Sequence, residues 1–133
     1  MGHKKIFINN FSSISALGST SVQIWRNLNE AKPNFSSRKF QNSFISVSAL
    51  SSAQEKELET LKNERKLYNY LDRTTLMAIF VGRHLKLNID LSRCGINIGS
   101  SRGATQTFED SHKTFLTEAE VPLTTSPTTT LGN

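Results

Sequence analysis

Apolar positions near the N-terminus predict a strand followed by a helix. Residues 5–9 (KIFIN) form a short apolar run typical of a buried strand, and a serine-rich turn follows through Gly18. Thr20 and Gln23 have the spacing of a capping box, in which each side chain accepts a hydrogen bond from the other residue's backbone N–H. The predicted helix ends near Pro33. One of its faces is apolar and carries Val22, Trp25 and Leu28.

The next two segments are more polar. Residues 35–50 mix aromatic and β-branched residues with serines, which is typical of an irregular segment or an edge strand. The apolar residues concerned are Phe40, Phe44, Ile45 and Val47. Residues 51–66 (SSAQEKELETLKNERK) are charged, with Leu58 and Leu61 as their few apolar contacts. We therefore predict that residues 51–70 form a charged surface helix or a lid.

Residues 71–87 (LDRTTLMAIFVGRHLKL) predict a different kind of helix. Asp72 can cap it, and its apolar residues occur on nearly every side. These residues are Leu76, Met77, Ile79, Phe80, Val81 and Leu85. Such a helix must be packed on several sides, so we expect Asp72, Leu76 and Phe80 to be buried. Because a short chain supplies few layers of its own, part of this packing should come from elsewhere.

Residues 93–99 (RCGINIG) alternate as a strand does, and a helix is predicted after them. One face of this strand would carry Cys94, Ile96 and Ile98. Gly99 and Gly103 then bracket a turn of small residues, after which Thr105 or Thr107 can cap a helix that lasts until about residue 120. The apolar contacts of this helix would be Phe108, Phe115 and Leu116.

The succession of strand, glycine turn and helix invites comparison with phosphate-binding loops. Residues 99–105 (GSSRGAT) lack both the Lys-Ser/Thr ending of a P-loop and the Gly-x-Gly-x-x-Gly of a dinucleotide-binding turn. We therefore favour a structural role, in which Gly99 and Gly103 permit a tight turn and close backbone packing.

Composition indicates a globular protein of one domain. The chain has 133 residues, of which 36% are hydrophobic and 20% charged. No apolar run approaches the roughly 20 residues that cross a bilayer, and the apolar stretch at the N-terminus is too short for a secretory signal. The single cysteine, Cys94, cannot form an internal disulfide. We predict a cytoplasmic protein without a membrane partner.

The net charge of +5 favours an acidic partner, such as nucleic acid, an anionic membrane or an acidic carrier protein. Only one stretch, residues 62–66 (KNERK), gathers three cationic side chains, namely Lys62, Arg65 and Lys66. It lacks the interleaved aromatic residues of a groove for single-stranded nucleic acid. Nucleic-acid binding is therefore the less favoured alternative.

Candidate catalytic and metal-binding residues are few. Cys94 lies on the predicted apolar strand face without a neighbouring base, so buried packing is favoured over a nucleophilic role. His3, His84 and His112 are scattered and offer no pair of metal ligands at a short spacing. Ser111 and His112 are adjacent on a helix and would point in different directions, which does not suit a catalytic triad. No metal or cofactor is expected.

Four segments carry a resemblance to a known family. In order they are INNFSSISALGSTSVQIWRNLNEAKPNF, LDRTTLMAIFVGRHL, RCGINIGSSRGATQTFEDSHKTFL and SPTTTLGN. Together they resemble the N-terminal half of the β-ketoacyl-acyl carrier protein synthases, which belong to the thiolase-like superfamily. The family's SPLG-like turn corresponds to residues 15–18, its Trp-x-x-Leu helix to Trp25 and Leu28, and its central Asp-Arg helix begins here at Asp72. Its glycine-rich turn is changed, with Ser101 and Ala104 in place of two glycines.

The resemblance implies an α/β protein, the N-terminal half of a thiolase-like layered α/β/α/β/α fold, incomplete as given. The helix that begins at Asp72 would be buried between sheets. The full-length protein would be an acyltransferase, catalysing a decarboxylative Claisen condensation in fatty-acid or polyketide-type chain extension. The family's nucleophilic cysteine and two catalytic histidines are expected beyond Asn133. No catalytic residue would then lie in this chain, and the segment alone would be inactive.

The resemblance also implies partners. Related synthases present basic residues before the central helix to the acidic acyl carrier protein, and Lys62, Arg65 and Lys66 occupy that place here; an ordinary solvated face is the alternative. The threonine-rich residues 121–133 would begin a helix at a dimer interface near the acyl pocket, or would form a disordered tail. The chain would pair with a second copy or with a synthase-like subunit.

Two other functions remain open at this point. The first is a non-catalytic partner subunit or carrier-protein-binding module that uses the same half-fold. The second is a small, basic nucleic-acid-binding protein, which would bind DNA or RNA tightly and with strong salt dependence.

Overall fold

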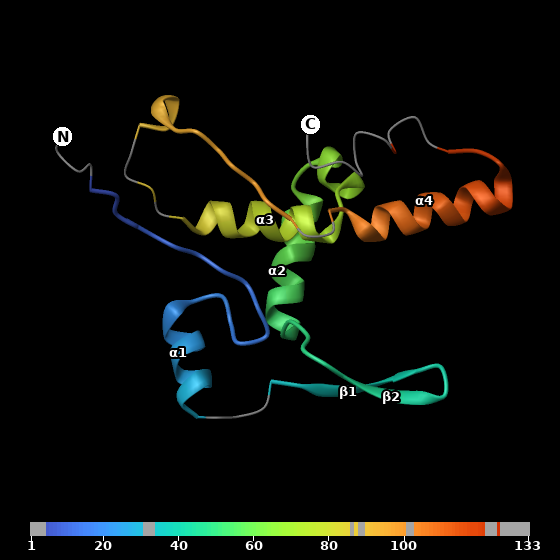
Figure 1. The fold of residues 1–133 in the computed structure, drawn as a ribbon, viewed down its shortest axis with the longest axis horizontal. Coiled ribbons are helices and arrows are strands. Elements are labelled where there is room, and N and C mark those ends of the chain that lie inside the picture. The colour runs from blue at the N-terminus through green and yellow to red at the C-terminus, as the bar shows by residue number, and fades with distance from the viewer. Residues whose placement is uncertain are drawn as a thin grey trace. The chain divides into compact units, whose positions relative to one another are not determined.

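The structure, a computed structural model, describes residues 5–30, 34–85, 87, 90–100, 103–121 and 125. These residues form a mixed α/β protein with four α-helices, two short 3₁₀ helices and a two-stranded antiparallel sheet (Figure 1). The chain divides into two compact units. The first comprises Met1–Glu57 and Val81–Leu87, and the second comprises Leu58–Phe80 and Asn88–Asn133.

The first described residues do not form the predicted strand. Residues 5–10 lie outside regular structure, and Ile6 and Ile8 are almost fully exposed. The prediction of a buried strand over residues 5–9 is therefore wrong for this structure, because no other described segment pairs with them. Regular hydrogen bonding begins at the turn between Ser15 and Gly18, whose backbone N–H groups donate to each other's carbonyl oxygens over 3.1 and 2.9 Å.

Helix α1 (Ser21–Asn29) begins at the predicted capping box, which is confirmed. The backbone N–H of Gln23 donates to Thr20 Oγ1 over 3.3 Å, and the N–H of Thr20 donates to Gln23 Oε1 over 3.3 Å. The Asn27 amide donates to the Leu17 carbonyl over 2.7 Å and so ties the helix to the preceding turn. The predicted apolar face of α1 is largely exposed; it carries Val22, Trp25 and Leu28.

Strands β1 (Ser36–Phe40) and β2 (Ser43–Val47) form a hairpin, which agrees with the edge-strand reading of residues 35–50. The register pairs Phe40 with Ser43, so the turn consists of two residues. Gln41, the first of them, adopts a left-handed φ of 52°, which two-residue hairpin turns require at this position.

Helix α2 (Ser52–Asn63) is the predicted charged helix. Ser51 and Gln54 form a capping box, in which the Ser51 N–H donates to Gln54 Oε1 over 2.9 Å and the Gln54 N–H donates to Ser51 Oγ over 3.3 Å. The buried Gln54 amide also donates to the Ser15 carbonyl over 2.9 Å. Farther along the helix, Leu58 and Leu61 are buried, as their isolated apolar character predicts.

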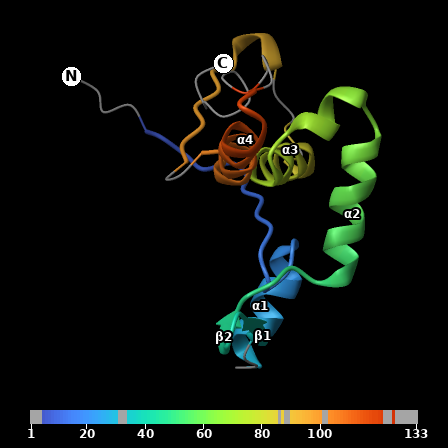
Figure 2. The ribbon, with the colours of Figure 1, turned by 90° about the vertical axis from the view of Figure 1, so that its right-hand side faces the viewer.

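The second unit contains the end of α2, the 3₁₀ helix η1 (Lys66–Tyr70), most of helix α3 (Arg73–His84) and all of helix α4 (Thr105–Glu118). The buried apolar residues of the described chain are few: Leu58, Leu61, Leu76, Phe80 and Ala104. All of them belong to this unit, and Asp72 is buried there as well. The N-terminal ends of α3 and α4 lie close together, as two views of the ribbon show (Figures 1 and 2).

Helix α3 is buried along one stripe and not on nearly every side. Leu76 and Phe80, four residues apart, are buried, whereas Met77, Ile79 and Val81 are only half-buried. The prediction of all-round burial is therefore wrong for this structure: among the described residues, α3 buries only the stripe that carries Leu76 and Phe80, as an amphipathic helix does.

The predicted strand over residues 93–99 is also absent. The segment follows a short 3₁₀ helix, η2 (Leu91–Arg93), and has no regular structure. Cys94 and Ile98 are exposed, and Ile96 is 87% exposed, so the expected burial of this apolar face is wrong. Residue alternation favours a strand, but a strand forms only where a neighbour pairs with its backbone, and no described segment does so.

Helix α4 begins where the sequence indicates and ends two residues earlier than expected. Its N-cap is Ala104, which has no side-chain capping bond, so the prediction that Thr105 or Thr107 caps the helix is wrong. The apolar residues expected to pack are exposed by half or more; they are Phe108, Phe115 and Leu116. The helix stops at Ala119, which takes a left-handed φ of 58°.

Candidate functional site

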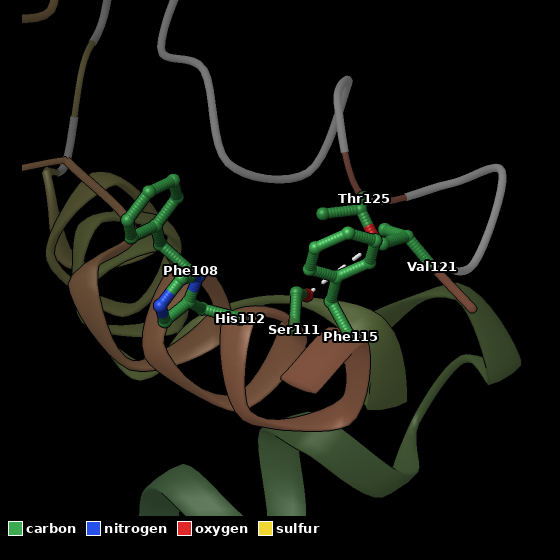
Figure 3. Close-up of a pocket in the computed structure, with 6 residues that line it drawn as sticks. All are labelled: Phe108, Ser111, His112, Phe115, Val121 and Thr125. Carbon is green, nitrogen blue, oxygen red and sulfur yellow. Dashed lines mark hydrogen bonds between the residues drawn. The ribbon is translucent and has the colours of Figure 1, made fainter. Parts of the chain in front are cut away.

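An apolar groove runs along α4 in the second unit (Figure 3). Its lining combines residues from α4 with two from the segment beyond the helix: Phe108, Ser111, His112, Phe115, Val121 and Thr125. The four helical positions follow one another at the spacing of a single helix face. The groove has a volume of about 260 Å³, which suits a small apolar group more than a whole cofactor.

Two hydroxyl groups form the polar part of the groove. Ser111 Oγ donates to the Thr107 carbonyl over 2.8 Å and lies 3.4 Å from Thr125 Oγ1, as the dashed line in Figure 3 marks. The His112 ring stacks on Phe108, with ring centroids 6.5 Å apart and planes inclined by 4°. The groove therefore offers an aromatic wall and a hydroxyl pair for holding a ligand.

This geometry does not activate a nucleophile. Ser111 Oγ is engaged with a carbonyl and a second hydroxyl, while His112 stacks on an aromatic ring. No hydrogen bond joins Ser111 to His112 among the described residues. Likewise, no group of three or more metal-ligating side chains occurs among the described residues.

Asp72 is a buried carboxylate of the second unit and contacts the first turns of both α3 and α4. Its Oδ1 accepts a hydrogen bond of 2.7 Å from the Thr74 N–H in the first turn of α3. Its Oδ2 accepts from the N–H and the hydroxyl of Thr107, in the first turn of α4, over 3.4 and 3.5 Å. Two helix N-termini thus share one carboxylate, and their positive dipole ends stabilise its charge.

The sequence predicted the first of these roles and missed the second. Asp72 stands directly before the apolar pattern of α3, which is a local signal for a cap. Its contact with α4 joins residues that are 35 positions apart, and no local signal specifies such a contact. The sequence contains only an indirect sign of this contact. Helix α4 begins after Ala104, whose side chain cannot cap a helix, so an acceptor for its first-turn N–H groups must come from elsewhere.

The basic residues Lys62, Arg65 and Lys66 lie around the end of α2 and the start of η1. Lys62 is half-buried, whereas Arg65 and Lys66 are exposed. The Arg65 guanidinium lies 5.7 Å from the centre of the Tyr68 ring, at a cation–π distance. None of the three forms an ion pair with a described acidic residue, so all three charges are available to an acidic partner.

Exposed apolar side chains accompany this basic cluster. Leu67 and Tyr70, both in η1, are each 68% exposed. The surface of η1 therefore combines positive charge with exposed apolar area. This combination is more typical of a protein-binding surface than of a face that contacts only water.

The remaining predicted residues do not form a site. Gly103 takes a left-handed φ of 65°, and its N–H donates to Ser100 Oγ over 3.0 Å, whereas a Cβ atom at Gly99 would meet no described atom within 4 Å. The close packing expected at Gly99 is therefore not observed. Cys94 is exposed, and its thiol donates to the Asp90 carbonyl over 3.3 Å.

Three further sequence-based predictions concern His84, His3 and residues 121–133. His84, expected within a buried helix, is exposed. His3 and nearly all of residues 121–133 lie outside the described residues, apart from Val121 and Thr125.

Comparison with known proteins adds no family. No protein-family model, no curated protein and no solved structure matches this chain. Among the described residues, none of the helices has the length and apolar character that crossing a membrane requires.

Proposed function

We propose that this chain is the N-terminal part of a divergent β-ketoacyl-acyl carrier protein synthase. The resemblance of its four ordered motifs is the basis of the proposal, and the mixed α/β content is compatible with it. One structural observation carries it further. The carboxylate of Asp72, from the Asp-Arg motif, binds the first turn of the helix that follows the glycine-containing turn, so two of the motifs form one unit.

The exposed apolar faces support a larger body than the described chain. Ile96 and Ile98 follow a strand-like alternation but lie in solvent, and α3 has half-buried apolar residues on the sides away from its core stripe. In a layered α/β/α/β/α fold, further sheet and helix layers would cover these positions. Burial of such surface stabilises a fold by about 25 cal/mol per Å².

The proposed reaction is a decarboxylative Claisen condensation. A cysteine thiolate takes the acyl group from its carrier thioester, and the malonyl thioester then loses CO₂. The carbanion that remains attacks the acyl–cysteine thioester, forming the new carbon–carbon bond and releasing the thiolate. The cysteine and the two histidines of this chemistry belong, in the proposal, to sequence beyond Asn133. This chain would supply structural layers and part of the carrier-protein surface.

The carrier protein would dock on Lys62, Arg65 and Lys66. Their charges have no acidic partner in the described chain, and exposed Leu67 and Tyr70 lie beside them. An acidic protein with an apolar contact surface would be steered by the charges and held by the apolar pair.

A condensation assay on the complete gene product tests the proposal. The protein encoded by the entire reading frame would be incubated with an acyl-carrier protein and malonyl-carrier protein labelled at the free carboxyl group. We expect release of labelled CO₂ together with a β-ketoacyl product. A reading frame that encodes no cysteine turn beyond residue 133, or a complete protein that forms no β-ketoacyl product, would refute it.

A non-catalytic partner subunit is the second candidate. The exposed apolar faces favour it equally, because a second chain could cover them in place of further layers of the same chain. In that case the complete gene product would bind the carrier protein without forming a product, and it would copurify with a catalytic subunit.

A further inference from the structure

The hairpin of β1 and β2 carries an unused strand edge. A two-stranded hairpin alone is marginally stable in water and normally gains a third strand or a packed face. Here most of its apolar side chains are exposed, with Phe40 at 61% and Phe44 at 75%. Within the described residues neither outer edge pairs with another strand.

The register determines which backbone groups the free edge of β1 offers. Phe40 pairs with Ser43 across the two-residue turn, and such closing pairs exchange backbone hydrogen bonds. Because the pattern alternates along an antiparallel ladder, the N–H and C=O groups of Ser37 and Lys39 point away from β2. These are the groups that an added strand would bind.

The charges of the hairpin specify its partner. Arg38 and Lys39 are adjacent in β1, so their side chains lie on opposite faces of the hairpin. Neither forms an ion pair with a described acidic residue, and residues 34–47 contain no Asp or Glu. A second copy of β1 at this edge would place like charges side by side, which is unfavourable.

Each cation has an aromatic neighbour on its own face. Phe40 lies two residues from Arg38 on the same strand, and Phe44 is the direct cross-strand partner of Lys39. A strand added at the free edge of β1 could therefore place an acidic side chain against each cation and an apolar side chain against Phe40, which lies on β1 itself.

We propose that the free edge of β1 binds an extended acidic segment of a partner protein as a third strand. The partner strand carries two consecutive acidic residues, one for each face, and an adjacent β-branched residue that contacts Phe40 on β1. Main-chain hydrogen bonds to Ser37 and Lys39 provide the register, and the two charge pairs provide the specificity. This surface is independent of the proposed synthase function and of the carrier-protein surface at η1.

Fluorescence anisotropy with the 133-residue chain tests the charge pairing. The probe is a dye-labelled, end-blocked peptide of sequence TVTEEVTV, and its counterpart TVTKKVTV serves as the charge control. We expect the acidic peptide to bind at least about tenfold more tightly than the basic one. The double substitution Arg38→Glu and Lys39→Glu should reverse this preference. Lys113→Glu, at an exposed position of α4, should leave it unchanged. Equal binding of both peptides would overturn the proposal.

Amide hydrogen exchange on the unsubstituted chain tests strand addition directly, and it does not depend on whether a substituted variant folds. Saturation with the acidic peptide should slow exchange of the Ser37 and Lys39 amides, which lie on the free edge, and should leave those of Phe44 and Ser46 unchanged. Binding without this protection, or protection of Phe44 and Ser46 alone, would overturn the assignment to β1.

Two competitors identify the class of partner. Single-stranded oligothymidine and vesicles containing phosphatidylserine are each added to the complex of chain and acidic peptide. We expect neither to displace the peptide at equal concentration of negative charge. If oligothymidine or vesicles displace it and bind at Arg38 and Lys39 themselves, the surface serves nucleic acid or membrane, and a protein partner is excluded.

Discussion

Replacement of Asp72 should loosen two helices at once. Asp72 is 5% exposed, and its carboxylate accepts hydrogen bonds from the first turn of α3 through Oδ1 and from the first turn of α4 through Oδ2. Asp72→Ala removes both acceptors, and Asp72→Asn keeps only one. The asparagine oxygen can still cap α3, whereas its amide group would meet the Thr107 N–H donor to donor.

The expected magnitudes follow from these contacts. Loss of an N-cap costs about 1 kcal/mol, and an anionic side chain at a helix N-terminus adds roughly 0.3–1 kcal/mol for each helix. The contact with Thr107 is long, at 3.4 Å, so its loss should cost on the order of 1 kcal/mol. We therefore expect Asp72→Ala to lower the free energy of unfolding by about 3 kcal/mol and Asp72→Asn, which keeps the α3 cap, by about 2 kcal/mol.

Urea unfolding followed by circular dichroism measures the loss, and amide hydrogen exchange locates it. In Asp72→Asn the first-turn amides of α4 should exchange faster while those of α3 remain protected. Asp90→Asn is the matched control, because Asp90 is exposed and caps only Ser92; it should change stability by less than about 0.5 kcal/mol. The reasoning fails if Asp72→Asn destabilises no more than Asp90→Asn, or if exchange in α4 is unaffected.

Three further predictions concern other contacts. Gly18→Ala should destabilise the chain by at least about 2 kcal/mol in urea unfolding, because φ is +129° and the new Cβ would lie 2.7 Å from Gln23 Cβ; an unchanged midpoint would contradict this. Thr20→Ala should cost about 1 kcal/mol and Thr20→Ser almost nothing, measured in the same way, since only the alanine lacks the capping oxygen. Reversal of Arg65 and Lys66 to Glu should weaken carrier-protein binding and flatten its salt dependence in titrations at several ionic strengths, and unaltered binding by the complete protein would remove the docking role.

Local signals predicted the helices well. The capping box of α1, the polar pattern of α2 and the Asp72 cap of α3 each depend on residues within one turn of the helix start, so the sequence contains the information directly. For α4, the sequence predicts only the position of the helix. Its N-cap residue forms no side-chain hydrogen bond, and the Thr107 N–H in its first turn donates instead to Asp72, 35 positions away in the chain.

Strands and burial were harder to predict because they depend on distant partners. Residues 5–9 and 93–99 have strand-like sequences, yet neither pairs with another described segment. Exposure of Ile96 and of the Trp25 face of α1 follows from the same cause, since apolar periodicity shows which side would be covered but not what covers it. The basic cluster could be found from its charges, whereas the α4 groove also required the position of Thr125 beyond the helix.

The side chain of Gln54 gives the first unit a cooperative element. Its oxygen accepts from the backbone N–H and the hydroxyl of Ser51, and its nitrogen donates to the Ser15 carbonyl, 39 positions away in the chain. Opening of the Ser15 turn would leave a buried amide without its acceptor, and fraying of α2 would move that amide away from the turn. The two segments should therefore melt in a single step. Gln54→Glu replaces the donating amide nitrogen with a carboxylate oxygen, which cannot donate to the Ser15 carbonyl when ionised, and should split the transition into two.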